Sequence, residues 1–162
     1  MRRIPLLALV LCAVSSVASA QAVNVTWHCV PQGTPTVLQV GDAAGHAYGI
    51  DQVKCTALKG SIGSVKEKDG VATEFTETTG DNATGHGEYV ETLSSGDQIH
   101  YKYTLTRVLK DGKPVSGGNK WSVVGGTGKF KGATGGGTCK GVANPDGSGN
   151  YDCTGNITGA GK

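Results

Sequence analysis

Apolar and polar residues alternate in short runs along almost the whole chain after residue 20. Successive side chains of a β-strand point to opposite faces, so this alternation predicts strands with one buried face. No window there carries apolar residues at positions i, i+3, i+4 and i+7 without an intervening glycine, so no helix is expected. The predicted strands cover residues 23–30, 36–40, 48–58, 63–68, 71–78, 87–93, 98–110, 120–124, 129–133, 138–142 and 150–157.

Turn sequences rich in glycine and aspartate separate several of these runs. They are Lys68-Asp69-Gly70, Ser95-Gly96-Asp97, Lys110-Asp111-Gly112 and Asp146-Gly147. Glycine and aspartate tolerate the positive φ angles that tight hairpin turns require. Eight or more short strands at this spacing, with no linker between domains, predict one all-β domain that is a sandwich or a closed antiparallel barrel.

The run at residues 98–110 indicates which side chains would be buried. One face carries Ile99, Tyr101, Tyr103 and Leu105, and the other carries His100, Lys102, Thr104 and Thr106. The less polar face of the preceding strand carries Tyr89, Glu91 and Leu93, and one face of residues 71–78 carries Val71, Thr73, Phe75 and Glu77. We expect the faces with the tyrosines and Phe75 to line the interior. The core is then modest, because the chain has only two Phe and two Trp.

The first twenty residues have the pattern of a secretory signal peptide. Arg2 and Arg3 give a basic start, residues 6–14 are apolar, and Ala18-Ser19-Ala20 places small residues at a cleavage site. The apolar stretch is too short to span a bilayer, which needs about 20 residues. We therefore expect cleavage after Ala20, and a secreted or periplasmic single domain at residues 21–162.

The exported domain is expected to have no net charge, because Arg2 and Arg3 account for the whole formal charge of +2. A neutral domain offers no electrostatic attraction for nucleic acid. No segment after residue 20 is apolar enough to cross a membrane as a helix. Nucleic-acid binding and membrane insertion are therefore not expected, and the oligomeric state is left open.

Four cysteines lie in the predicted exported domain: Cys29, Cys55, Cys139 and Cys153. An even number in an exported chain predicts two disulfides, for which three pairings are possible. We favour Cys29–Cys55 and Cys139–Cys153, because the second pair brackets the turn sequence at residues 144–147 and one hairpin would bring both thiols together. A zinc site is disfavoured by the absence of any C-x-x-C pair. No metal and no other cofactor is expected.

Residues 125–135, Gly-Gly-Thr-Gly-Lys-Phe-Lys-Gly-Ala-Thr-Gly, are the most distinctive stretch. Glycine is required where φ is positive and where strands bend or approach closely. We expect five structural glycines here: Gly125, Gly126, Gly128, Gly132 and Gly135. Phe130 is expected to plug a barrel corner. The spacing matches neither a phosphate-binding loop nor a dinucleotide-binding fingerprint.

This stretch resembles part of the allene oxide cyclase/dirigent-like barrel superfamily. In that superfamily an apolar strand leads into a Gly-Gly-Thr-Gly-[Lys/Arg]-[Phe/Tyr]-x-Gly pattern, and a glycine-punctuated strand follows. Here Trp121-Ser122-Val123-Val124 leads in and Thr138-Cys139-Lys140-Gly141 follows, and the likeness covers roughly residues 87–142. The resemblance implies a calycin-like, eight-stranded antiparallel barrel with a pocket at one mouth. Plant members close an epoxide ring or steer the coupling of phenoxy radicals, but the glycine pattern marks the fold and not the chemistry.

The candidate ligand-binding residues are Tyr89, Glu91, Tyr101, Tyr103 and Arg107. Alternation turns them toward one interior, where burial would raise the pKa of Glu91 and suit it to general-acid chemistry. The guanidinium could bind a ligand carboxylate, or pair with Glu91 or Glu77. The alternative is that the tyrosines fill a core and Arg107 forms a structural ion pair.

Three functions remain open from the sequence. The leading one is an exported barrel that binds a small apolar or aromatic ligand. The second is a cyclase- or dirigent-type enzyme acting in the barrel lumen, and the third is a structural or interaction protein that uses its outer face. No catalytic residue is assigned. The histidines form no compact metal pattern and are expected to be solvated; they are His28, His46, His86 and His100.

Overall fold

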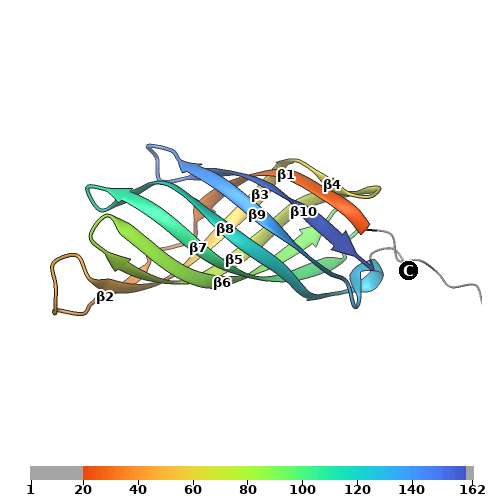
Figure 1. Cartoon of the computed structure of the whole chain (residues 1–162). Coiled ribbons are helices and arrows are strands. Elements are labelled where there is room, and N and C mark those ends of the chain that lie inside the picture. Colours follow the sequence, from red (N-terminus) through yellow and green to blue (C-terminus); the bar gives the residue numbers. More distant parts are fainter. Residues whose placement is uncertain (1–19, 160–162) are drawn as a thin grey trace, which may run out of the picture.

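The computed structural model describes residues 20–159, which form β-strands and one short 3₁₀ turn (Figure 1). The elements are β1 (Ala20–Pro31), β2 (Thr36–Gln39), β3 (Ala47–Lys59), β4 (Ser61–Ile62), β5 (Val65–Thr79), β6 (Asn82–Leu93), β7 (Gln98–Lys110), β8 (Lys113–Gly126), η1 (Gly128–Phe130), β9 (Thr134–Ala143) and β10 (Gly149–Thr158). The signal-peptide prediction falls on residues 1–20 and so lies, apart from Ala20, outside the described residues.

Eight of these strands close into an antiparallel barrel. The hydrogen-bonded order is β3-β1-β10-β9-β8-β7-β6-β5, and β5 pairs again with β3. This closing pairing is extensive, since β3 pairs with β5 from Ala47↔Thr78 to Thr56↔Asp69. Closure leaves the barrel strands no free edge along these pairings, which solves the main liability of an all-β fold. The predicted closed antiparallel eight-stranded barrel is confirmed.

The two shortest strands lie at opposite ends of the barrel (Figure 1). β2 continues the line of β1 along β3, because Pro31 faces Val53 and Thr36 faces Ile50. β4 forms a small hairpin with the start of β5 at the end where η1 lies. We call the end with η1 the closed end and the end with β2 the mouth.

The hairpin turn predicted at Lys68-Asp69-Gly70 is wrong. β5 runs through these residues as one strand, with a register shift between Glu67 and Asp69. Gly70 serves a different purpose, because a Cβ there would overlap the ring of Tyr89 on β6. The other three turn predictions are confirmed, since those sequences connect β6 to β7, β7 to β8 and β9 to β10.

The buried face predicted for residues 71–78 is also wrong. Phe75 is 49% exposed and Glu77 lies on the outer surface, while Ala72 and Glu74 are buried. The reason is that both faces of this strand carry polar side chains, so alternation alone does not show which one turns inward. Glu74 is turned inward because its partners, Tyr103 and Arg107 on β7, lie in the lumen.

The glycine-rich segment turns the chain between β8 and β9. The strand predicted at residues 129–133 is wrong, because η1 occupies Gly128–Phe130. Phe130 is only 1% exposed and belongs to the core, as predicted for a plug at a barrel corner. Gly128 and Gly132 have φ angles of 53° and 73°, which favour glycine.

The other predicted structural glycines differ in how closely the chain packs around them. A Cβ at Gly126 would lie 2.7 Å from the carbonyl oxygens of Gln98 and Phe130, and one at Gly135 would overlap the backbone of Asn156. At Gly125 the nearest atom would be 4.0 Å away, so the fold does not require glycine there.

The closed end of the barrel is solid. Five side chains there are at most 1% exposed: Ile62, Leu93, Ile99, Phe130 and Ile157. Both predicted disulfides are present, Cys29–Cys55 between β1 and β3 and Cys139–Cys153 between β9 and β10. Each joins residues that face one another directly in the sheet. They lie further along the lumen, toward the mouth.

Candidate ligand site in the barrel lumen

A cavity of about 100 Å³ lies in the lumen beyond the solid end. All five residues predicted to bind a ligand line it: Tyr89, Glu91, Tyr101, Tyr103 and Arg107. They come from β6 and β7, whose inward faces were read correctly from the alternation. Side chains that the prediction missed complete the wall, notably Trp27, Glu67, Asn119, Trp121 and Tyr151, together with both disulfides.

Four aromatic rings form a continuous row around the cavity. Ring centroids are 5.6 Å apart for Trp27 and Tyr89, 5.8 Å for Tyr89 and Tyr101, and 5.6 Å for Tyr101 and Trp121. The first and last pairs are nearly perpendicular, at 79° and 88°. Edge-to-face packing of this kind is favourable and holds each ring in one orientation.

Glycines on neighbouring strands make room for these rings. A Cβ at Gly70 would overlap Tyr89, and a Cβ at either Gly137 or Gly155 would overlap Trp121. The same relation holds between Gly87 and Tyr103 and between Gly141 and Tyr151. A ring that packs against bare backbone stays close to the wall of the barrel. The high glycine content therefore keeps part of the lumen open.

An acidic cluster lies between the cavity and the closed end. Tyr101 donates a hydrogen bond of 2.6 Å to Oε2 of Glu91, which is 1% exposed. Burial raises the pKa of Glu91 to about 7, against a smaller lowering by the Tyr101 hydrogen bond. Burial, and then repulsion from Glu91, raises the pKa of Glu67 to about 8.

Three polar atoms of this cluster have no hydrogen-bond partner among the described residues. They are Oε2 of Glu67, Oε1 of Glu91 and the hydroxyl of Tyr89. A buried polar group without a partner costs roughly 1–3 kcal/mol, so it marks a place where a ligand or water can bind.

A second polar cluster lies toward the mouth and includes Arg107. Its guanidinium forms an ion pair with Glu74, which also accepts a hydrogen bond of 2.8 Å from Tyr103. The predicted partners of Arg107, Glu91 and Glu77, were therefore wrong. Burial, and then repulsion from Glu74, raises the pKa of Asp51 to about 6. One oxygen of Asp51 and one of Asn119 are also without a partner in residues 20–159.

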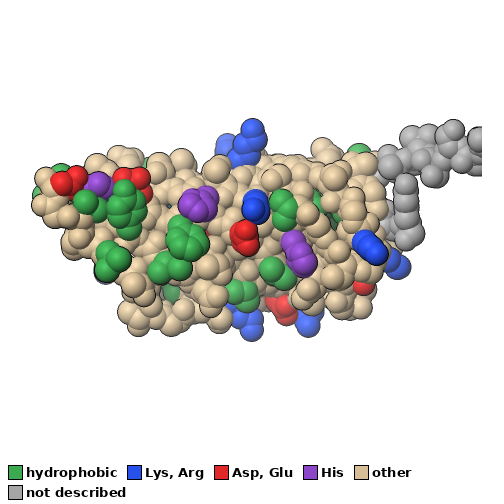
Figure 2. Space-filling model, turned by 90° about the horizontal axis from the view of Figure 1, so that it is seen from below, with side chains coloured by type: hydrophobic (Ala, Val, Ile, Leu, Met, Phe, Trp, Pro, Cys, Tyr) green, Lys and Arg blue, Asp and Glu red, His purple; other side chains and the backbone are tan. Residues whose placement is uncertain are grey.

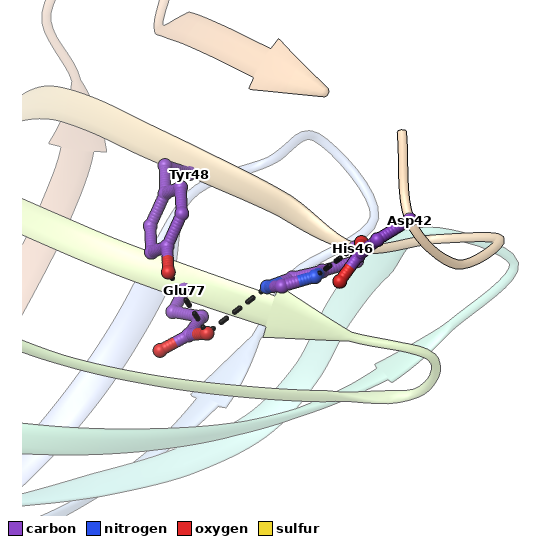
Figure 3. A network of polar contacts seen from close by, with 4 residues as sticks. All are labelled: Asp42, His46, Tyr48 and Glu77. Carbon is purple, nitrogen blue, oxygen red and sulfur yellow. Dashed lines mark hydrogen bonds and ion pairs between the residues drawn. The ribbon is translucent and has the colours of Figure 1, made fainter. Parts of the chain in front are cut away.

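The outer surface mixes polar and apolar side chains. Figure 2 shows hydrophobic side chains gathered over the mouth end, beside acidic side chains and a histidine. There His46 lies between two carboxylates (Figure 3), with 2.7 Å from Nδ1 to Asp42 and 3.0 Å from Nε2 to Glu77. These hydrogen bonds, Asp42 first, raise the pKa of His46.

All four histidines were predicted to be solvated, but their surroundings in the structure differ. His46 is 16% exposed and doubly hydrogen-bonded, His86 stacks on Phe75, and Nδ1 of His28 lies 2.9 Å from Oδ1 of Asn150. No group of three or more potential ligand side chains in the described residues is arranged to hold a metal ion. Within the same residues no helix is long and apolar enough to span a membrane.

Comparison with known proteins identifies the architecture. No protein-family model matches the chain, and no curated protein matches it in sequence. Among solved structures, the chain is similar to the pterocarpan synthase dirigent protein, with a TM-score of 0.53 and 11% sequence identity. The match covers 95% of this chain and 98% of that one. At this identity the likeness shows the fold alone, which is a dirigent-like barrel.

Proposed function

We propose that this protein is exported and binds a compact small molecule in the lumen of its barrel. The observation that carries the proposal is the cavity itself, which combines an aromatic wall with polar atoms that lack partners. Small-molecule sites typically have this composition, with mostly apolar walls and a few converging polar groups.

The size of the cavity limits the ligand. Typical ligand pockets measure roughly 300–1,000 Å³, whereas this cavity measures about 100 Å³. An apolar cavity of about 150 Å³ holds benzene. The ligand is therefore no larger than one ring or a branched group of similar size, with an apolar or aromatic body and at least one polar group directed at the acidic cluster.

Export is proposed from the signal-peptide pattern at residues 1–20, and the two disulfides are consistent with an oxidising compartment. The test is the intact mass of the protein recovered from the culture medium or periplasm of its expression host. A mass that corresponds to residues 21–162 with four cysteines oxidised supports export. Recovery of only the uncleaved, reduced chain from the cytoplasm would contradict it.

Ligand binding is tested by thermal shift and native mass spectrometry with a panel of small phenols, alcohols and amines. A matched variant, Ala72→Leu, places a larger side chain on the lumen wall, where Ala72 is 6% exposed. We expect at least one compound to raise the Tm of the wild type and to lose this effect in the variant. If no compound binds, or if the variant binds as well as the wild type, the lumen is not the site.

An enzyme acting in the lumen is the second candidate, because Glu91 lies in an apolar surrounding with a pKa near neutrality and a tyrosine hydrogen bond. Such a carboxyl can give and take a proton near pH 7. If the panel yields a turnover, Glu91→Gln should abolish it while leaving binding in place. Turnover that survives this substitution would remove Glu91 from the reaction.

A further inference from the structure

The lumen contains more carboxyl groups than cations. Glu67 and Glu91 line its cavity, as does Arg107. Two further carboxyl groups lie near the guanidinium, because Glu74 pairs with it and Asp51 lies beside Glu74. Arg107 is already engaged by Glu74 at the mouth. In the described part of the chain Glu67 and Glu91 form no ion pair, although they are only 7% and 1% exposed.

We propose that the ligand of the lumen is a small organic cation, a primary or methylated ammonium group, held between the aromatic rings with its charge against Glu67 and Glu91. This inference rests on the proposed function and names the chemical class of its ligand. Buried charges in proteins are paired or neutralised. A bound ammonium would supply the missing partner for two buried carboxyl groups at once.

The aromatic wall favours the same class of ligand. Tyr89 packs against the wall at Gly70, and Trp121 packs against it at Gly137 and Gly155. Both rings line the cavity. The faces of tyrosine and tryptophan rings are electron-rich and attract ammonium groups, by about 2 kcal/mol or more when the site is dry. Aromatic cages of this kind bind methylated ammonium groups.

The protonation of the two glutamates follows from such binding. Their pKa values of about 7 and 8 mean that both are partly protonated near pH 7 when the lumen holds no cation. A bound ammonium favours the carboxylate form, so a carboxyl proton leaves to the buffer as the ion pair forms. Tyr89 and Tyr101 also lie beside this pair and stay protonated, because burial raises their pKa well above 10. Asp69 lies near Tyr89 and forms an ion pair with Lys68.

The size of the cavity sets the upper limit for the ammonium group. At about 100 Å³ the space accommodates a head group of a few heavy atoms, such as methylammonium or tert-butylammonium, with limited side-chain movement. One pair of probes can show whether the site prefers a cationic ligand or a neutral ligand that forms hydrogen bonds. Tert-butylammonium and tert-butanol have nearly the same shape and differ in charge.

The test is isothermal titration calorimetry of the disulfide-bonded protein with each probe, at pH 7 in two buffers of different ionisation enthalpy. We expect tert-butylammonium to bind at least tenfold more tightly than tert-butanol, with release of protons. In the wild type, its affinity should rise between pH 6 and pH 8. Glu67→Gln/Glu91→Gln should remove the preference, whereas Glu88→Gln should keep it, because Glu88 pairs with Lys102 on the outer surface.

The outcomes separate the two proposals. If tert-butanol binds as tightly as tert-butylammonium, or the cation binds without proton release, the cationic ligand is ruled out and the lumen site stands. If cation binding is unchanged in the double variant, the charge is bound elsewhere and the inference fails. If neither probe nor any compound of the panel binds, both the inference and the proposed function fail.

Discussion

At the scale of single residues, Glu67 and Glu91 are the most unusual groups in the molecule. Each carboxyl lies among apolar and aromatic side chains, and burial is the main cause of its raised pKa. In the unfolded chain both return to ordinary values near 4.5. The folded state therefore binds more protons than the unfolded state between about pH 4.5 and pH 8.

This difference makes stability depend on pH. A raised folded-state pKa contributes stability that is complete below the unfolded value and is lost as pH rises through the folded value. We expect the free energy of unfolding to fall by a few kcal/mol between pH 5 and pH 8.5, since each pKa unit corresponds to about 1.4 kcal/mol. Urea unfolding at several pH values measures this. Glu67→Gln should flatten the profile and Glu88→Gln should not; a profile that rises over this range would contradict the assignment.

The ion pair between Arg107 and Glu74 gives a second prediction at this scale. Arg107 is 18% exposed and Glu74 9% exposed, so each depends on the other for its charge partner. Arg107→Leu should destabilise the protein by about 3 kcal/mol, because it leaves a buried carboxylate beside Asp51 without a cation. Chemical denaturation measures the change. Adding Glu74→Leu should restore part of the loss, and a double variant as unstable as the two single changes summed would show that the pair is not coupled.

At the scale of elements, aromatic rings of one strand pack against glycines of neighbouring strands. β9 and β10 supply Gly137 and Gly155, and Trp121 of β8 occupies the space that their missing side chains leave. The rings can then lie along the wall without filling the lumen. The cavity is in this sense a property of pairs of strands and of no single residue.

This arrangement predicts different costs for two substitutions of glycine by alanine. Gly137→Ala should destabilise the barrel by about 1–3 kcal/mol, because the new methyl group displaces the Trp121 ring from the wall. Gly125→Ala on the preceding strand should be nearly neutral, since its methyl group meets no atom closer than 4.0 Å. Thermal unfolding followed by tryptophan fluorescence measures stability, and in a Trp27→Phe background it also reports the environment of Trp121. Equal costs at the two positions would refute the role of the ring.

At the scale of the whole molecule, closure of the barrel protects the backbone amides of all eight barrel strands from local opening. Each of the eight barrel strands is hydrogen-bonded to a neighbouring strand on both sides. β2, in contrast, pairs only with β3, and all four of its residues are exposed. Opening the barrel requires several strands to separate together, but β2 can detach by itself.

Hydrogen exchange tests this picture. We expect the slowest amides to be spread over β1, β3 and β5–β10, with exchange in β2 faster by at least tenfold. Mass spectrometry of peptic fragments under native conditions measures the pattern. Fast exchange throughout β1 and β10 would mean that the pairing between them is open in solution, and the closed barrel would then be wrong.

Much of the architecture was predictable because it depends on local patterns in the sequence. Alternation in residues 98–110 places Tyr101 and Tyr103 inward whatever strand lies beside them, since the period of two is a property of the extended backbone. Phe130 among glycines predicted the corner between β8 and β9. The pairing of Cys139 with Cys153 followed from the single turn that separates them.

Only part of the cavity lining was predictable from the sequence, because the orientation of the other lining side chains depends on contacts with residues distant in the chain. Residues 71–78 carry polar side chains on both faces, and only Tyr103 and Arg107, about 30 positions later, make Glu74 the inward one. Likewise, β5 continues through the residues predicted to form a turn, with a register shift in its pairing with β6. By itself the sequence predicted most of the strands, the inward tyrosines and the favoured one of three possible disulfide pairings. The closed ring of strands, through long-range pairing, decided which carboxyls are buried together and that a cavity remains between them.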